Sequence, residues 1–175
     1  MKKIITIFLA IFFISTSSNS NENEIRLNNL FEKLKIQNHS IAIDTEMKIW
    51  DIWTKHPTNQ NLTSLLSRGT KFMNQEQYSV AVDIFTTVIK KDPAWAEAWN
   101  KRATVFYLMG KYQDSQNDID KVLKLEKRHF GALSGQGLVQ IKLKNYEKVK
   151  ELYPSMRSPQ IMIPQIKELI KNQSV

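Results

Sequence analysis

The 175-residue chain contains no cysteine. Disulfides, thiolate nucleophiles and cysteine metal ligands are therefore excluded, and so is a lipid attached to an amino-terminal cysteine. Histidine is scarce as well, because His39, His56 and His129 stand far apart and no His-Glu-x-x-His motif occurs. No paired spacing of metal ligands is present in the sequence. We predict no metal site and no cofactor.

Glycine is also rare, and the five glycines form no phosphate-binding loop. The pair Gly135 and Gly137 lacks the rest of a dinucleotide fingerprint, and no Gly-x-Ser-x-Gly elbow occurs. Carboxylates are scattered; Asp118 and Asp120, two residues apart, cannot share one face of a helix. We predict that the protein is not an enzyme. An unrecognised hydrolase is a third hypothesis, which an alignment of acid and base residues would test.

Acidic residues are outnumbered, with 17 Asp and Glu against 25 Lys and Arg, a formal net charge of +8. The basic residues are densest between Lys121 and Lys150. Lysines of this kind commonly solvate the outer faces of helices. The alternative is that they bind an acidic protein, an anionic envelope polymer or a lipid headgroup surface. Nucleic acid is disfavoured, because no aromatic residues alternate with the basic ones as stacking would require.

One apolar run lies near the start of the chain. Lys2 and Lys3 precede Ile4 to Ile14, and small polar residues follow as far as Ser20. A charged head, a run shorter than the roughly 20 residues of a membrane span and a small-residue tail predict a signal peptide over residues 1–20. The Ile- and Phe-rich run is typical of bacterial export, so we expect a periplasmic protein. The alternative is anchoring to the inner membrane by the uncleaved segment.

The strongest signal is an internal repeat. A step of 34 residues pairs small residues with small residues and aromatic residues with aromatic residues. Small residues let two helices approach closely, and aromatic residues fill the space between hairpins. Pro93 lies where a helix must end. The matching sets are Leu65, Trp99 and Leu133; Gly69, Ala103 and Gly137; Phe72 and Phe106; Tyr78, Tyr112 and Tyr146; and Phe85, Ile119 and Tyr153.

This pattern resembles the tetratricopeptide repeat (TPR) family, over about half of the chain. Residues 62–95 carry nearly the whole motif, and residues 96–129 have Lys127 where the family has proline. Residues 130–153 depart from it, because Gln140 replaces an aromatic residue and Pro154 shortens the second helix. The resemblance implies an all-α fold, a right-handed α-solenoid of antiparallel helical hairpins with about two and a half repeats. A generic helical bundle is the alternative.

The repeat array is expected over residues 59–153, between an amino-terminal capping hairpin at 21–58 and a carboxy-terminal capping helix at 154–175. The array helices are predicted at 62–74, 77–90, 96–109, 112–125, 130–143 and 146–153. Terminal units of such arrays must cover an apolar face. The helix at 130–143 contains three glycines, so it should be the least stable unless something packs on it.

The capping hairpin is predicted to contain helices at 24–36 and 41–55, with Ser40 as the cap of the second helix. Met47, Trp50 and Trp53 are expected on one face of that helix. They favour core packing, and a ligand platform is the alternative. In the carboxy-terminal cap, Pro164 suits the first turn of a helix, where its missing N–H is not needed.

The resemblance also implies a concave groove lined by the first helix of each repeat, which would bind an extended peptide or a partner helix. A solvated inner face is the alternative. The predicted groove residues are Leu66, Thr70, Met73, Asn100, Lys101, Thr104, Tyr107, Leu138 and Ile141, and the same pattern also turns Thr63, Glu97, Ser134 and Lys142 inward.

One variant of the family grips a terminal carboxylate with Lys, Asn and Arg side chains. The positions here that match this clamp are Leu66, Thr70, Lys101, Gly131 and Gly135, and none carries the expected residue. A buried carboxylate would lack its hydrogen bonds, so we predict that the clamp is absent.

These observations favour a non-catalytic protein–protein interaction module or scaffold of the bacterial cell envelope. Its partner is predicted to be a protein or peptide, and the sequence leaves the oligomeric state open. The alternative function is electrostatic binding to an anionic envelope polymer or membrane surface through the basic residues 121–150.

Overall fold

The computed structural model describes residues 22–36, 38–145, 148–149 and 151. The regular elements in this part of the chain are helices, so the all-α prediction is confirmed. The described residues divide into two compact units, with the boundary between Thr63 and Ser64. The predicted signal peptide at 1–20 and the predicted capping helix at 154–175 lie outside the described residues.

The first unit contains a helix over residues 22–33 and helix α2 (His39–Trp53). Aromatic side chains join the two helices. The ring of Phe31 lies 6.0 Å from that of Trp53, and Trp50 meets Trp53 edge-on at 5.5 Å between ring centroids. Trp53 is buried, which supports core packing for this residue.

Two predicted details of α2 are wrong. Asn38 caps the helix instead of Ser40, because it lies in extended backbone and its Oδ1 accepts a hydrogen bond from the Ile41 N–H at 3.2 Å. Met47 is 59% exposed and does not share the buried face with Trp53. Two successive steps of three residues drift by about a third of a turn on a 3.6-residue helix, so the three residues do not lie on one face.

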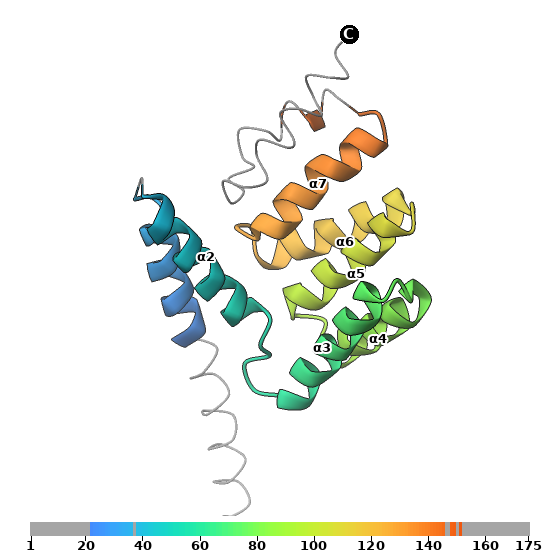
Figure 1. Ribbon diagram of the computed structural model, residues 1–175, viewed down its shortest axis with the longest axis horizontal. Coiled ribbons are helices and arrows are strands. Elements are labelled where there is room, and N and C mark those ends of the chain that lie inside the picture. Colours follow the sequence, from blue (N-terminus) through green and yellow to red (C-terminus); the bar gives the residue numbers. More distant parts are fainter. Residues whose placement is uncertain (1–21, 37, 146–147, 150, 152–175) are drawn as a thin grey trace, which may run out of the picture. The chain divides into compact units, whose positions relative to one another are not determined.

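The second unit holds the repeats. Its helices follow one another in chain order in Figure 1, and α3 begins within the end of the first unit. Each helix from α4 to α7 contacts the next, and α5 also contacts α7. The observed bounds agree with the predicted ones to within two residues; residues 148, 149 and 151 are helical within the predicted helix at 146–153. The helices are α3 (Gln60–Asn74), α4 (Tyr78–Lys91), α5 (Ala96–Leu108), α6 (Tyr112–Leu125) and α7 (Phe130–Lys142).

The 34-residue repeat is visible in the backbone where α3, α5 and α7 end. At each of these ends an N–H reaches back five residues to a carbonyl oxygen, over 2.8–2.9 Å. The residue before this donor has a left-handed φ: 59° at Glu76, 73° at Gly110 and 58° at Lys144. This is the Schellman arrangement for closing a helix. The donor–acceptor pairs are Gln77 and Phe72, Lys111 and Phe106, and Asn145 and Gln140.

Small residues let the helices of a hairpin approach closely, as predicted. On α3, a Cβ added to Gly69 would lie 2.5 Å from Cε1 of Phe85, a fully buried residue of α4. Between α5 and α6, the Ser115 hydroxyl donates to the backbone oxygen of Ala103 at 2.8 Å. At position 69, a side chain would overlap the Phe85 ring unless the ring moved.

Polar side chains add bonds between the helices. Arg102 on α5 grips Asp118 on α6 with two bonds of 2.7 and 2.8 Å, and its third nitrogen donates to Thr86 on α4 at 3.0 Å. Gln140, which departs from the family pattern, donates to Gln116 at 2.7 Å between two buried side chains. A hydrogen bond between α6 and α7 thus replaces the aromatic contact.

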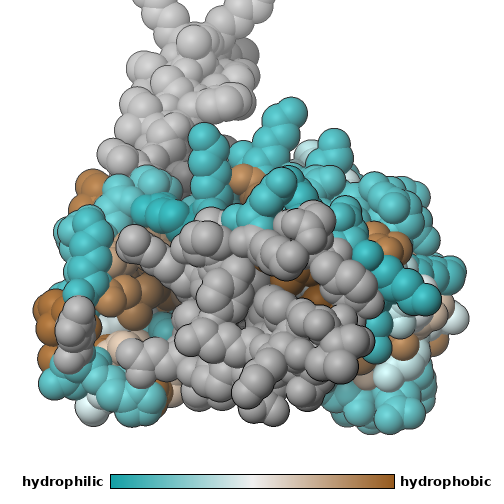
Figure 2. Space-filling model, turned by 90° about the horizontal axis from the view of Figure 1, so that it is seen from above, coloured by the Kyte–Doolittle hydropathy of each residue, from teal (hydrophilic) through white to brown (hydrophobic). Residues whose placement is uncertain are grey.

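Over the described residues, the face seen in Figure 2 is mainly hydrophilic, with hydrophobic residues in separate patches.

Candidate partner-binding site

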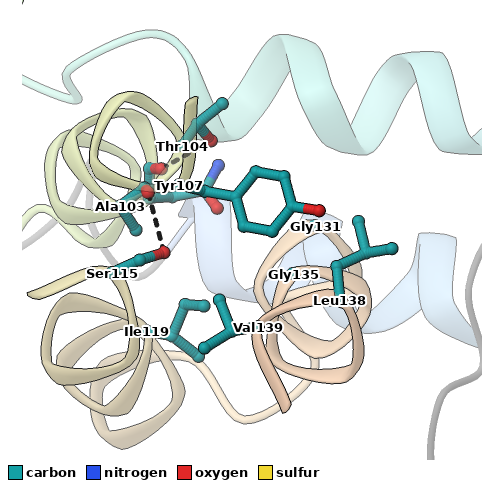
Figure 3. Close-up of a pocket in the computed structure, with 10 residues that line it drawn as sticks. Ala103, Thr104, Tyr107, Ser115, Ile119, Gly131, Gly135, Leu138 and Val139 are labelled. Atoms are coloured by element: carbon teal, nitrogen blue, oxygen red, sulfur yellow. Dashed lines mark hydrogen bonds between the residues drawn. The ribbon is translucent and has the colours of Figure 1, made fainter. Parts of the chain in front are cut away.

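Helices α5, α6 and α7 line a half-open hollow of about 160 Å³. In Figure 3, Tyr107 extends from α5 toward α7, where Leu138 lies, and Ile119 and Val139 lie close together at the base. Ile119 and Val139 are buried, whereas Tyr107 and Leu138 are half-buried. The hollow is lined by Asn100, Ala103, Thr104, Tyr107, Ser115, Ile119, Gly131, Gly135, Leu138 and Val139.

Two glycines line this hollow on the side of α7. Gly131 and Gly135 lie four residues apart, and hence on one face of the helix, and both line the hollow. A Cβ on Gly135 would meet Cδ1 of Ile119 at 3.4 Å, an ordinary contact distance. The space beside Gly135 is therefore open, in contrast to that beside Gly69.

The structure brings together four of the nine predicted groove residues: Asn100, Thr104, Tyr107 and Leu138. The other five do not line this hollow. Leu66 and Ile141 are only 3% and 6% exposed and belong to the core. Thr70 donates to the backbone oxygen of Leu66, Lys101 pairs with Glu97, and Met73 is half-buried.

The four other positions that the family pattern turns inward also differ from one another in their exposure to solvent. Glu97 and Ser134 are 1% and 0% exposed, so they are buried instead of facing a groove. Thr63 is half-buried and accepts a hydrogen bond from the His56 N–H at 2.9 Å, whereas Lys142 is exposed. The inward turn of a helix therefore does not by itself make a residue accessible.

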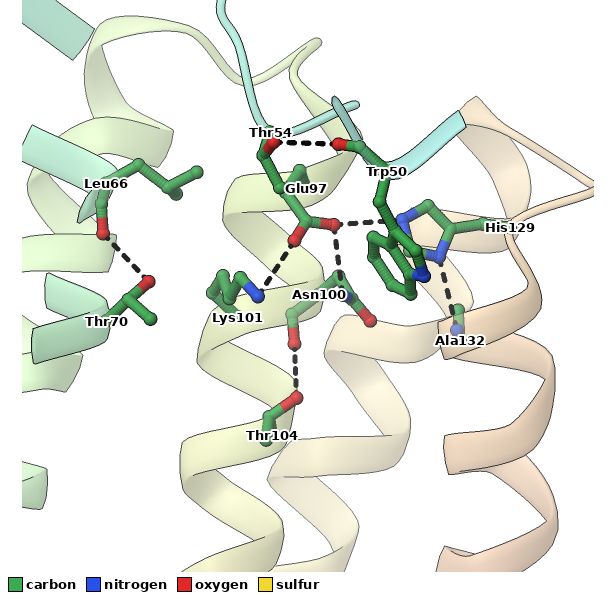
Figure 4. Close-up of polar contacts among 10 residues, drawn as sticks. All are labelled: Trp50, Thr54, Leu66, Thr70, Glu97, Asn100, Lys101, Thr104, His129 and Ala132. Atoms are coloured by element: carbon green, nitrogen blue, oxygen red, sulfur yellow. Dashed lines mark hydrogen bonds and ion pairs between the residues drawn. The ribbon is translucent and has the colours of Figure 1, made fainter. Parts of the chain in front are cut away.

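A buried polar cluster that was not predicted from the sequence lies near the amino-terminal ends of α5 and α7 (Figure 4). The ring of His129 lies with Nε2 at 3.0 Å from Oε2 of Glu97, and both side chains are fully buried. The other ring nitrogen, Nδ1, accepts a hydrogen bond from the Ala132 N–H at 3.2 Å and so caps α7. Because Nδ1 is an acceptor, this geometry places the proton of a neutral ring on Nε2, which donates to Glu97.

Glu97 has two further partners on its own helix. Asn100 donates from Nδ2 to Oε2 at 3.0 Å, and the Lys101 ammonium lies 3.1 Å from Oε1. Burial by itself raises the pKa of Glu97, but the hydrogen bond from His129 and the charge of Lys101 lower it further than burial raises it. The pKa of Glu97 therefore lies below its ordinary value, and the carboxylate is charged at neutral pH.

Asn100 connects the cluster to the hollow, since it bonds Glu97 and also lines the cavity. The Glu97–His129 contact joins α5 to α7, which form two walls of the hollow, so it fixes their spacing. The repeat offered one signal for this contact. The residue 34 positions before His129 is Trp95, which is also the buried cap residue of its helix. A histidine at this position of a repeat is therefore expected to be buried.

No helix within the described residues is both long and apolar enough to cross a membrane. The same part of the chain contains no group of three or more His, Asp or Glu residues placed to hold a metal ion.

Known proteins resemble this chain in sequence and in fold, although no family model matches it. A TPR repeat-containing protein of Rhizobium etli is 31% identical over 154 residues, which cover 82% of this chain and 74% of that protein. The chain belongs to the TPR repeat proteins. The family predicted from the 34-residue pattern is therefore confirmed.

Solved TPR domains share the fold at lower identity. The TPR2B domain of yeast Sti1, solved as a pHsp70 complex, aligns with a TM-score of 0.62 and 18% identity, over 66% of this chain and 99% of that one. The first TPR of Spaghetti (RPAP3), bound to the HSP90 peptide SRMEEVD, aligns with a TM-score of 0.60 and 19% identity, over 66% and 95%. At these identities the likeness shows the TPR fold alone.

Proposed function

We propose that this TPR protein is a non-catalytic interaction module of a bacterial cell envelope, which binds a peptide segment or a helix of a partner protein in the hollow of Figure 3. The observation that carries the proposal is the hollow itself. Three helices contribute to it, its base is apolar, and Tyr107 and Leu138 flank it. Concave apolar sites with a few polar groups are typical of ligand recognition.

The TPR2B domain of Sti1, solved as a pHsp70 complex, and the first TPR of Spaghetti, solved with an HSP90 peptide, support a peptide or protein as the partner. The geometry agrees with a groove in which a few side chains of an extended segment or an amphipathic helix act as anchors. Thr104 lies at the exposed side of the hollow, so a bound segment would pass over it.

The envelope location rests on the sequence at residues 1–20, whose charged head and apolar run have the pattern of an export signal. Cell fractionation and amino-terminal sequencing of the protein test it. A mature chain beginning near residue 20 in the periplasmic fraction is expected. An intact amino terminus in the membrane fraction would favour the uncleaved anchor instead.

Two matched threonines allow a direct test of the hollow. Thr104 on α5 and Thr87 on α4 are both exposed, and each hydroxyl donates to the backbone oxygen four residues earlier, at 3.0 and 2.9 Å. Only Thr104 lines the hollow. A photo-crosslinking amino acid at Thr104 should capture a defined partner in living cells, whereas the same group at Thr87 should not. Equal capture from both positions would place the binding site elsewhere.

The same experiment at raised salt tests the electrostatic alternative. Lys121, Lys124 and Lys127 are exposed and available to an anionic surface, whereas Arg128 is paired with Glu126 at 2.8 Å. Screening weakens interactions between exposed charges beyond roughly 8 Å at physiological ionic strength. We expect the Thr104 crosslink to persist at high salt. Its loss there would favour the basic region as the binding element.

A further inference from the structure

The chemistry of the hollow indicates which group of a partner enters it. We propose that the hollow selects an uncharged apolar side chain of about leucine size, together with the N–H of an adjacent peptide group, and that it rejects a carboxylate. This inference rests on the proposed function, because it names the anchor that the partner inserts.

The size and surface of the hollow fit an apolar anchor. Its volume is about 160 Å³, and apolar protein cavities of roughly 150 Å³ hold a molecule the size of benzene. Ile119 and Val139 form a buried apolar base, and the Tyr107 ring and Leu138 provide apolar sides. An aliphatic side chain would exchange water for these contacts, which favours binding.

The charges around the hollow oppose an acidic anchor. None of the described residues that line it is charged. Lys101, next to Asn100 in the chain, has its ammonium 3.1 Å from the Glu97 carboxylate and neutralises it. A carboxylate entering here would lose its water shell without gaining a charged donor.

Asn100 supplies the polar contact. Its side chain is 7% exposed, and Nδ2 donates to Glu97 at 3.0 Å. This bond engages Nδ2 with Glu97, and Oδ1 is the acceptor that Asn100 offers to a guest. A peptide N–H beside the anchor has the matching chemistry. The expected ligand is therefore an apolar residue within a peptide and not a terminal acidic residue.

Backbone-amide NMR of the full chain with two probes tests this selectivity. N-acetyl-leucinamide presents the apolar side chain and two amides, and N-acetyl-aspartic acid amide presents a carboxylate on the same backbone. N-acetyl-leucinamide should shift the amide signals of Thr104, Tyr107 and Gly135, and the acidic probe should leave them in place. Equal or tighter binding of the acidic probe, or no binding of N-acetyl-leucinamide, overturns the inference.

A substitution that fills the hollow without harming the helix provides the control. Gly135→Ala adds a methyl group that would lie 3.4 Å from Ile119, inside the cavity. Affinity for N-acetyl-leucinamide should fall by about tenfold, as overpacking of about 1.4 kcal/mol would produce, while the thermal midpoint does not fall. Thr87→Ala, away from the hollow, should bind as the wild type does. Unchanged affinity in Gly135→Ala contradicts the inference.

The two proposals fail separately. A partner captured through Thr104 by a chain that does not bind N-acetyl-leucinamide would overturn the selectivity and leave the proposed function standing. Selective binding of N-acetyl-leucinamide without any Thr104 crosslink would support the chemistry of the hollow and remove the proposed function.

Discussion

Gly69 on α3 and Gly135 on α7 present the same absence of a side chain to different surroundings. Beside Gly69 the ring of Phe85 fills the space, with a carbon 2.5 Å from where a Cβ would be. Beside Gly135 the nearest atom is a methyl group of Ile119 at 3.4 Å, and the remaining space is the hollow. Glycine at position 69 serves the packing of a hairpin, whereas glycine at position 135 leaves volume for a guest.

The two regions also differ in what holds their helices together. The α3–α4 contact at Gly69 is an apolar contact between a ring and a backbone. The α5–α7 contact depends on the buried Glu97–His129 bond, which lies near one end of the hollow. Packing fixes the first pair at van der Waals distance, and a hydrogen bond holds the second pair apart at a set spacing. Substitutions can test each half of this contrast.

The largest effect is expected from His129→Ala, which removes the bond to Glu97 and the cap of α7. We expect a loss of about 3–5 kcal/mol in the free energy of unfolding, since a buried charge loses a partner. His129→Asn keeps a capping oxygen but does not reach Glu97, and it should be about 1 kcal/mol less harmful than alanine. Urea unfolding measures both. Equal losses in the two variants would show that the cap contributes little.

Gly69→Ala tests the close contact between α3 and the Phe85 ring of α4. Its Cβ would overlap the Phe85 ring, so we expect a loss of about 1–3 kcal/mol, which exceeds the gain of about 1 kcal/mol in helix propensity. Thermal unfolding against Gly135→Ala, the same substitution in open space, provides the measurement. A Gly69→Ala protein as stable as the wild type would mean that the hairpin can separate at little cost.

The charge on Glu97 should contribute about 1 kcal/mol, the difference between charged and neutral hydrogen bonds. Its pKa is lower in the folded state than the ordinary 4.5, so this stability is present above that pH and is lost as the pH falls through the folded value. Glu97→Gln should therefore be less stable than the wild type from pH 5 to 8. The difference should vanish in more acidic solution, where the wild-type carboxyl is protonated. A pH-independent difference in unfolding free energy between the two proteins contradicts this assignment.

The smallest effect concerns Gly135→Ala in the protein without a guest. The added methyl group makes an ordinary contact, so the gain in helix propensity should stabilise the chain by up to about 1 kcal/mol. Calorimetry of the free protein measures the change. Destabilisation would show that the hollow is already filled in the resting protein.

The helices could be predicted from the sequence because their limits depend on nearby residues. Pro93 and the 34-residue pattern located the turn between α4 and α5. In the structure, α4 ends at Lys91 and α5 begins at Ala96. The packing of Gly69 followed from the same repeat. The Asn38 cap was missed because Asn38 and Ser40 both have capping side chains and the sequence alone does not choose between them.

The site was harder to predict because it depends on how successive repeats are rotated. Tyr107 and Leu138 line the hollow, whereas Leu66 and Ile141, predicted for the same groove, are buried. Glu97 and His129 lie 32 residues apart, and no local spacing connects them. Their contact depends on the arrangement of three helices, which a helix-by-helix analysis does not supply.

The left-handed residues Glu76, Gly110 and Lys144 close their helices with the same backbone bonds although their side chains differ. The backbone conformation that ends the first helix of a repeat is therefore the same in each repeat and does not require one particular side chain. A duplicated copy of residues 96–129 would contain the same helix end, so the array could be extended by whole repeats with the same type of turn.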